Sequence, residues 1–248
     1  MFKATSNKIF SIQICSIILS AIGIYVYGLG IEEIATFFIF YFLFCGVGLS
    51  MMLHRFYAHK SFTFKSPIVE KLCILIMILA GRGSPIGWVY VHREHHAYSD
   101  TSKDPHKADT LLMLLPHVTK VKNINLRVVR DLLDKENIFI DKWYLLFHII
   151  FVSILTIINP WLTVFVWALP VCLTATMLDL STYGNHVENL PLSYRNFETK
   201  EYSRNSLMFG YLMFGEGWHN NHHAKASASS FKRKWWEFDP VGSIIKIV

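Results

Sequence analysis

The sequence predicts an all-α integral membrane protein, with four transmembrane helices in two hairpins and a cytoplasmic helical cap that holds a histidine-rich di-metal site. Composition is the first reason, because 52% of the 248 residues are hydrophobic and only 17% are charged, against about 25% in soluble domains. The second is four apolar runs that we expect to cross a bilayer, at residues 9–29, 34–53, 143–158 and 161–178. The third is a set of histidine motifs, which lie outside these runs.

Short turns join the expected spans in pairs. Residues 28–33 form the first turn and carry Glu32 and Glu33. Asn159 and Pro160 form the second turn, where Pro160 suits the first position of the helix that follows. Each pair of spans is therefore expected to be a helical hairpin.

A long mixed region, residues 54–141, separates the two pairs. Residues 68–80 are apolar but too short to span, so we expect a helix that lies at the membrane interface or is buried in protein. Residues 125–135 carry leucine and valine at helical spacing and predict an amphipathic helix. Since no linker or long repeat divides the chain, we expect a single domain, residues 1–248.

The basic residues predict the orientation of the protein in the membrane. All 24 Lys and Arg precede the first apolar run, separate the second from the third, or follow the fourth. Cytoplasmic segments carry such an excess of Lys and Arg. The termini and the histidine motifs are therefore expected in the cytoplasm. No nucleic-acid-binding motif accompanies the basic residues, so we expect no nucleic-acid partner.

The most informative motif is H-x-x-H-H. On a helix, His95 and His96 each fall within roughly 60° of His92, so the three imidazoles share one broad face. Composition alone would produce this motif roughly 0.03 times in such a chain, yet it occurs twice. Crowded imidazoles repel one another when protonated, so a shared metal is the simplest explanation. Imidazole suits Zn, Cu, Fe and Ni.

Other histidines enlarge this candidate site. The second H-x-x-H-H is His219, His222 and His223, and His54, His59 and the isolated His186 bring the total to nine. A zinc site uses three or four ligands, so nine ligands predict two metals. His54 and His59 are about 140° apart on a regular α-helix. They therefore serve different metals, or the helix ends between them.

Two alternative metal sites are disfavoured by the motifs. H-E-x-x-H, the motif of zinc proteases, is absent. Ferritin-like di-iron cages need two E-x-x-H motifs, and the chain has one, Glu216–His219. A nearly all-histidine, two-metal site beside a membrane instead favours dioxygen chemistry on a lipid-borne substrate.

Taken together, HRFYAH, HREHHAYSDTSKDPH and GEGWHNNHH resemble the histidine boxes of the membrane fatty acid desaturases. The Δ9 acyl-CoA (stearoyl-CoA-type) desaturases are the branch to which the chain is most similar, over roughly its whole length. The resemblance implies an oxidoreductase that inserts a cis double bond, at Δ9, into a saturated acyl chain. It also implies two iron ions (Fe2+/Fe3+), O2 as co-substrate and two external electrons. The metal ligands that it implies are His54, His59, His92, His95, His96, His186, His219, His222 and His223.

The resemblance leaves the partners partly open. Animal acyl-CoA enzymes of this branch often carry Arg-Asp where this chain has Tyr90 and Val91. The acyl substrate could accordingly be linked to CoA, to acyl-carrier protein or to a membrane lipid. No H-P-G-G motif of a fused cytochrome b5 occurs. We therefore expect a separate electron donor, such as ferredoxin or cytochrome b5 with a reductase.

Several polar residues are candidates to support the ligands. Asp100, Asp104 and Glu216 are expected either to orient imidazole N–H groups or, for the two Asp, to cap the surface. Thr182 stands where the family often has an Asn that helps one metal through water, and Asn185 is adjacent to His186. Arg55 and Arg93 are either ion-pair partners near the ligands or solvated charges.

Other residues are expected to contact the acyl chain, or to have no part in the site. Trp88 is expected either to line an acyl tunnel or to lie at the membrane interface. Val47 and Met177 are candidates for the closed end of that tunnel, which would measure chain length. The histidines that lack the box spacing are expected to be ordinary polar residues, namely His106, His117 and His148.

Three other functions remain open at this point. A membrane lipid or alkane hydroxylase would use similar histidine motifs. A non-enzymatic metal-binding or transport protein would carry ionisable residues inside its spans, and these spans hold almost none. A helical membrane scaffold would leave the histidine motifs unexplained.

Overall fold

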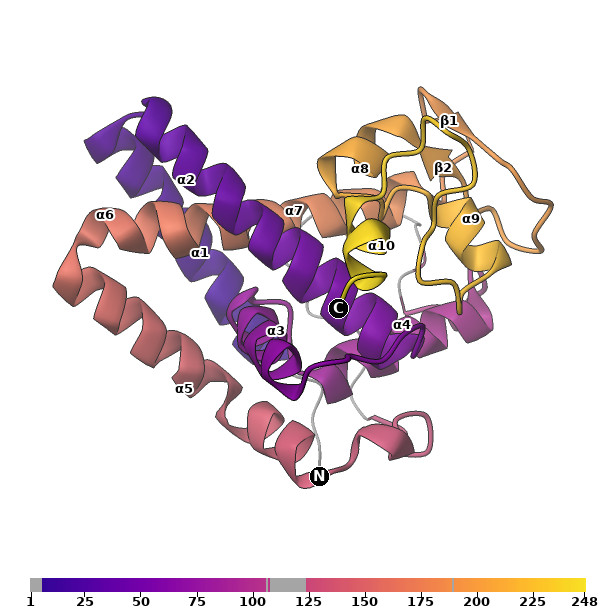
Figure 1. The fold of residues 1–248 in the computed structure, drawn as a ribbon, viewed down its shortest axis with the longest axis horizontal. Helices are drawn as coiled ribbons and strands as arrows, with labels where there is room; N and C mark the ends of the chain where they lie inside the picture. The colour runs from indigo at the N-terminus through magenta and orange to yellow at the C-terminus, as the bar shows by residue number, and fades with distance from the viewer. Residues whose placement is uncertain (1–5, 106, 108–123, 189) are drawn as a thin grey trace.

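Helices make up most of the protein (Figure 1). The computed structural model describes residues 6–105, 107, 124–188 and 190–248. The helices of the membrane region and its neighbours are α1 (Ser6–Tyr27), α2 (Ile31–Tyr41), η1 (Phe42–Ala58), α3 (Pro67–Leu79), α4 (Pro85–Tyr98), η3 (Arg130–Leu132), α5 (Lys135–Ile158), α6 (Pro160–Leu162), η4 (Thr163–Ala168) and α7 (Leu169–Gly184). The C-terminal part contains β1 (Ser193–Tyr194), β2 (Asn205–Ser206), α8 (Leu207–Leu212), α9 (His219–Ala224) and α10 (Pro240–Ile245).

Four helices are long and apolar enough to cross a membrane, as predicted. They are Asn7–Tyr27, Ile31–Ala58, Lys135–Ile158 and Pro160–Gly184. The helices extend beyond the predicted apolar runs, most clearly the second, which continues past residue 53 to Ala58. Hydropathy marks only the apolar part of a helix, whereas backbone hydrogen bonding carries these helices on into polar sequence.

A side-chain hydrogen bond joins the two short turns between the spans. Gly28 has a φ of 74°, a left-handed conformation that glycine adopts without strain. In the other turn, the Asn159 side chain accepts a hydrogen bond from the Trp161 backbone N–H. The Trp161 indole N–H then donates to Glu33 Oε1 over 2.9 Å, which links the ends of both helix pairs.

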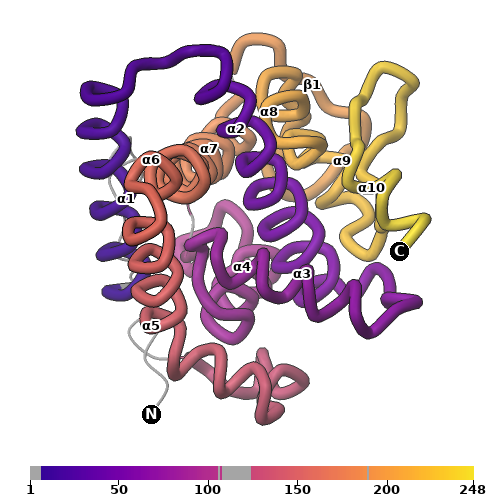
Figure 2. The backbone as a smooth tube through the Cα atoms, turned by 60° about the vertical axis from the view of Figure 1, so that its left-hand side comes forward, coloured from indigo at the N-terminus to yellow at the C-terminus, as the bar shows by residue number. Residues whose placement is uncertain are grey.

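The fourth span lies between the first and the second (Figure 2). η4 and α7 pack against α1 on one side and against α2 on the other. Gly23 permits the close approach to α1, because a Cβ there would lie 2.3 Å from a methyl carbon of Val164. Although each turn joins two consecutive helices, the two expected hairpins are therefore not separate packing units.

The mixed region departs from the prediction in one place. α3 occupies the apolar segment 68–80 and exposes Ile68 and Leu72 on one face while it buries Met77 on the other. Residues 125–135, however, do not form an amphipathic helix. They form turns and the short η3, because Asp134 ends the segment by accepting a hydrogen bond from Asn137 N at the start of α5. The apolar patch at residues 111–118 lies outside the described residues.

A compact C-terminal segment packs against η1, which α10 contacts (Figure 1). β1 and β2 pair antiparallel, with Ser193 opposite Ser206 and Tyr194 opposite Asn205. The Asn205 side chain bonds both the backbone N–H and the side chain of Asn221 in α9. This small sheet therefore fixes the helix that carries the third histidine motif.

Candidate metal centre

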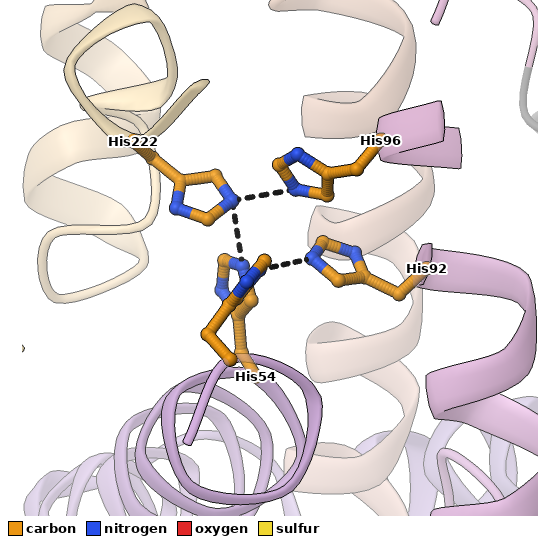
Figure 3. Close-up of side chains that lie close together, drawn as sticks. His54, His92, His96 and His222 are labelled. Atoms are coloured by element: carbon orange, nitrogen blue, oxygen red, sulfur yellow. Dashed lines mark hydrogen bonds between the residues drawn. The ribbon is translucent and has the colours of Figure 1, made fainter. Parts of the chain in front are cut away.

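The nine histidines expected as ligands lie together in two clusters. The first cluster consists of His54, His59, His92, His96 and His222, and the second of His95, His186, His219 and His223. Within each cluster, one ligand atom from every residue lies within 4.8 Å of the others. Figure 3 shows His54, His92, His96 and His222 pointing toward one another. They come from η1, α4 and α9.

Both His54 and His59 belong to the first cluster. Of the two alternatives left open by the sequence, the helix does end between them, because η1 stops at Ala58, whereas an assignment to different clusters was wrong. η1 has the i→i+5 hydrogen bonding of a π-helix, and the His59 N–H donates to the His54 carbonyl over 3.2 Å. In this geometry, residues five apart face the same side. The wider helix therefore brings both imidazoles to one site.

Each H-x-x-H-H motif supplies both clusters. In α4, His92 and His96 face the first cluster and His95 faces the second. In α9, His222 belongs to the first cluster, whereas His219 and His223 belong to the second. Adjacent histidines point in different directions on a helix, so one motif can bridge two sites. His186 follows the end of α7 and completes the second cluster.

Carboxylates hold the Nδ1 side of several imidazoles. Glu216 receives the His54 Nδ1–H, and Asp104 lies 3.0 Å from His95 Nδ1. Asp100 lies 2.9 Å from His186 Nδ1. When a neutral imidazole donates its Nδ1–H to a carboxylate, its Nε2 keeps a free lone pair. The three acidic residues named from the sequence therefore face ligand histidines.

The Nε2 atoms converge at the spacing that a metal requires. His59 and His92 Nε2 lie 2.8 Å apart, and His54 and His222 Nε2 lie 3.0 Å apart. In the second cluster, His219 Nε2 lies 2.9 Å from that of His186. Two nitrogens bound at right angles, each about 2.1 Å from one ion, would be about 3.0 Å apart. Free lone pairs at this distance repel unless a cation lies between them, so the residues fit two metal ions.

Burial favours the neutral form of six of these imidazoles, which is the form that binds a metal. It lowers the pKa of His59 to about 2, aided by the nearby His54. Burial and neighbouring histidines also lower the pKa values of five others well below their usual range, namely His92, His96, His219, His222 and His223. Burial would raise the pKa of Glu216, but His54 and Arg55 outweigh it and lower that pKa to about 2.

The arginines within the first two motifs form ion pairs. Arg55 is fully buried and donates to Asp239 over 3.0 Å, with Glu216 at 3.6 Å. Its guanidinium also lies 4.0 Å from the centre of the Phe231 ring, which in turn contacts His54 and His222. Arg55 is therefore an ion-pair partner near the ligands and not a solvated charge.

Arg93 anchors the end of η1. It forms a two-pronged pair with Asp131, with shortest contacts of 2.7 and 3.0 Å. It also donates to the carbonyls of Tyr57 and Ala58, which precede His59. Arg93 is thus also an ion-pair partner, and it orients the backbone next to a ligand.

The remaining candidate residues are distributed around the clusters. Trp88 stacks on the His92 ring at 4.9 Å between centroids, with an interplanar angle of 15°. Val47 is buried in η1, and Met177 is half-buried in α7, which contacts η1. The Thr182 hydroxyl donates to the Leu178 carbonyl within its own helix. Asn185 is buried, and its side-chain oxygen has no hydrogen-bond partner among the described residues.

Of the histidines expected to be ordinary, His148 is described, whereas His106 and His117 lie outside the described residues. His148 is buried in α5 between Tyr144 and Trp167. It belongs to neither cluster, in agreement with its lack of box spacing.

Two residues near the site were not foreseen. Glu201 lies 3.5 Å from His223 Nδ1, and Asp239 is the buried partner of Arg55. Both come from loops distant in sequence from their partners. Only the tertiary structure brings them to the site, although Asp239–Pro240 does resemble a helix start.

These features describe a chain with four helices long and apolar enough to cross a membrane and with two adjoining polyhistidine clusters. The chain matches the fatty acid desaturase family model over residues 34–246 and belongs to that family. It is therefore an oxidoreductase that acts on fatty acyl chains. The predicted family, near the Δ9 desaturases, is confirmed, and a non-enzymatic metal carrier or membrane scaffold is no longer an alternative.

Three relatives illustrate the similarity. The chain is 31% identical to the sn-1 stearoyl-lipid 9-desaturase of Anabaena variabilis over 202 residues, 78% of this chain and 72% of that protein. It is 30% identical to the sn-2 palmitoyl-lipid 9-desaturase of Nostoc sp. (strain 36) over 207 residues, 79% and 71% of the two chains. It is also 30% identical to Delta-9 acyl-lipid desaturase 2 of Arabidopsis thaliana, over 78% and 64% of the two chains.

Proposed function

We propose that the chain is a di-iron acyl-lipid desaturase that inserts a cis double bond at Δ9 of a saturated acyl chain. The observation that carries this proposal is the convergence of nine histidine ligand atoms in two adjoining clusters, within a chain of the fatty acid desaturase family. A single metal would leave one cluster of facing lone pairs without a cation.

In this proposal, the first cluster holds one iron and the second holds the other. Bound iron would supply O2 activation strong enough to remove hydrogen from an unactivated C–H bond. Overall, O2, two electrons and two protons convert a –CH2–CH2– unit to –CH=CH– and two waters. Glu216, Asp100 and Asp104 keep the facing Nε2 atoms unprotonated. Trp88 covers the ring of His92 and excludes water from that side.

The acyl carrier is proposed to be a membrane lipid. Three relatives carry names that describe lipid-linked substrates. Tyr90 and Val91, which replace the Arg-Asp pair of animal acyl-CoA enzymes, are buried within the fold. They therefore offer no exposed charge to a CoA head group. CoA and acyl-carrier protein are the competing carriers in the experiment below.

The test is expression in a desaturase-deficient host, followed by analysis of lipid-bound, CoA-bound and protein-bound acyl chains. We expect a cis-Δ9 alkene on membrane lipids and about two irons per purified chain. His95→Ala and His222→Ala should each abolish the product, because each removes one ligand from a different cluster. His117→Ala, outside the boxes, should retain activity. An alkene on CoA alone, or one zinc and no iron, would contradict the proposal.

A di-iron hydroxylase is the second candidate, because similar histidine clusters serve both reactions. The same lipid analysis separates the two, since a hydroxylase would yield an alcohol from the saturated chain. The names of the relatives favour the desaturase.

The orientation is also part of the proposal. We infer that the termini and the histidine clusters lie in the cytoplasm, where a separate donor such as ferredoxin or cytochrome b5 with its reductase would deliver electrons. The supporting observation is the location of all 24 basic residues on one expected side. Cysteines placed at Lys103 and Lys234 should react with impermeant reagents only from the cytoplasm. Labelling from outside the cell would reverse the assignment.

A further inference from the structure

A group of exposed aromatic and aliphatic side chains lies on the C-terminal part of the protein, away from the histidine clusters. Trp235 is 84% exposed, and Trp236, Phe238, Tyr211 and Leu212 are each exposed by 38% to 48%. They come from α8 and from the loop at residues 231–239. Contiguous exposed apolar surface of this kind marks an interaction site.

One hydrogen bond indicates how deep this surface lies in the bilayer. Tyr41 is ten residues beyond Ile31, where the second span begins, so it lies about 15 Å along the helix. That is about half of the 30 Å hydrocarbon thickness. The Tyr41 hydroxyl donates to the Leu212 carbonyl over 3.0 Å. The end of α8 is therefore only one side chain away from the middle of a spanning helix, with Leu212 exposed.

Two contacts extend this surface to the 231–239 loop. The Tyr211 hydroxyl donates to the Trp236 carbonyl over 2.7 Å. The ring of Phe238 stacks on Tyr211, with 6.0 Å between centroids and 9° between planes. The exposed tryptophans therefore adjoin residues at membrane depth. Tryptophan and tyrosine concentrate at the bilayer–water interface, where their apolar and polar parts are both accommodated.

The loop is held rigidly from within. Glu237 is fully buried and accepts hydrogen bonds from Tyr194, Asn196 and Asn221. Asp239 is also buried and pairs with Arg55. Since these carboxylates face inward, the residues between and before them face outward. The exposed tryptophans are therefore presented by an ordered loop.

A basic triplet borders the aromatic residues. Lys232 and Arg233 are exposed, and Arg233 donates to the carbonyls of Ser230 and Lys232, which orient the guanidinium without neutralising its charge. The Lys234 ammonium lies 5.1 Å from the centre of the Trp236 ring. The two carboxylates of the same loop are buried, Glu237 in hydrogen bonds and Asp239 in its ion pair with Arg55. The outer face of the loop is therefore cationic and aromatic.

From this arrangement, we propose that α8 and the 231–239 loop form a lipid-binding platform that occupies the membrane interface and binds the phosphate of anionic lipids through Lys232 and Arg233. Anionic headgroups complement the basic triplet, and the adjoining aromatic residues fit the upper acyl region. The platform requires only that the four apolar helices span a bilayer, so it does not depend on the acyl chemistry.

The first experiment measures depth in the full-length chain in lipid nanodiscs. A fluorophore is attached at Trp235→Cys after the four native cysteines are replaced by alanine, with the same label at Lys103→Cys as the water-exposed control. We expect nitroxide lipids to quench position 235 and aqueous iodide to quench position 103. The exposed Lys232→Cys provides a second site if Trp235→Cys is unstable. Quenching of both loop positions by iodide alone would overturn the proposal.

The second experiment measures lipid selectivity with spin-labelled phosphatidylglycerol against spin-labelled phosphatidylcholine. K232Q/R233Q should reduce the preference for phosphatidylglycerol, by roughly fivefold for each charge removed. K103Q/K200Q removes two exposed charges elsewhere and should leave the preference unchanged. An equal loss of phosphatidylglycerol preference in the two double variants would show a general charge effect and contradict the platform. Shielding of position 235 by an acidic electron-carrier protein, without lipid quenching, would assign the surface to a protein partner instead.

Discussion

The Glu216 carboxylate offers a way to weaken one metal site while leaving the other intact. Glu216 is buried, receives the Nδ1–H of His54 and accepts a hydrogen bond from Ser50 over 2.6 Å. Its pKa is lowered to about 2, because His54 and Arg55 outweigh the effect of burial. It is therefore ionised at neutral pH. Glu216→Gln removes this charge and keeps the size of the side chain.

The expected loss of metal affinity can be worked out from the role of carboxylates that bind a ligand histidine. A partner that receives the N–H of a ligand histidine typically contributes 10- to 100-fold in metal affinity. This corresponds to about 1.4–2.7 kcal/mol. The described contacts of Glu216 reach only the first cluster, through His54, whereas Asp104, Asp100 and Glu201 serve the second. We therefore expect E216Q to weaken one iron and to spare the other.

The assay is the iron content of the purified protein after equilibration with increasing concentrations of a chelator. Wild type should release its two irons over one range, whereas E216Q should release one of them at roughly 10- to 100-fold lower chelator. Ser50→Ala is the matched control, since it removes a hydrogen bond to the same carboxylate but no charge. It should shift the curve much less. An unchanged curve for E216Q, or equal loss of both irons, would refute the reasoning.

Three further outcomes are expected. Replacing Val47 by Trp should shift the products toward shorter acyl chains, because it would fill the proposed end of the tunnel. Replacing Met177 by Ala should extend the range to longer chains, and unchanged products from both variants at normal iron content would place the end elsewhere. Asp239→Asn should lower the free energy of unfolding by about 3 kcal/mol, because the more distant Glu216 would be the one carboxylate left, among the described residues, to pair with the buried Arg55. That loss should appear as a melting temperature lower by roughly 10 °C, and an unchanged melting temperature would contradict it.

The sequence predicted what depends on local pattern. Hydropathy identified all four long helices, because a span needs a continuous apolar run whatever surrounds it. The spacing of the histidine boxes identified the nine residues that the structure brings together. Asp100, Asp104 and Glu216 could be proposed as their partners because each lies close in sequence to a box.

Features that depend on unusual backbone or distant contacts were not predictable in this way. The relation of His54 to His59 requires π-helical hydrogen bonding in η1, whereas the estimate from sequence assumed a regular α-helix. Residues 125–135 carry a helical pattern, but Asp134 starts α5 there instead. Asp239 pairs with Arg55 across 184 positions of sequence, and no local pattern reports such a contact.

The 231–239 loop connects the metal site with the membrane surface. On its inner side, the Phe231 ring lies 4.6 Å from that of His222, and Glu237 accepts a hydrogen bond from Asn221, the residue before His222. On its outer side, the same loop presents Trp235. The buried Glu237 and Asp239 hold the loop between these two sides. The contacts that order the proposed platform are therefore also contacts of α9, the helix that carries a ligand histidine.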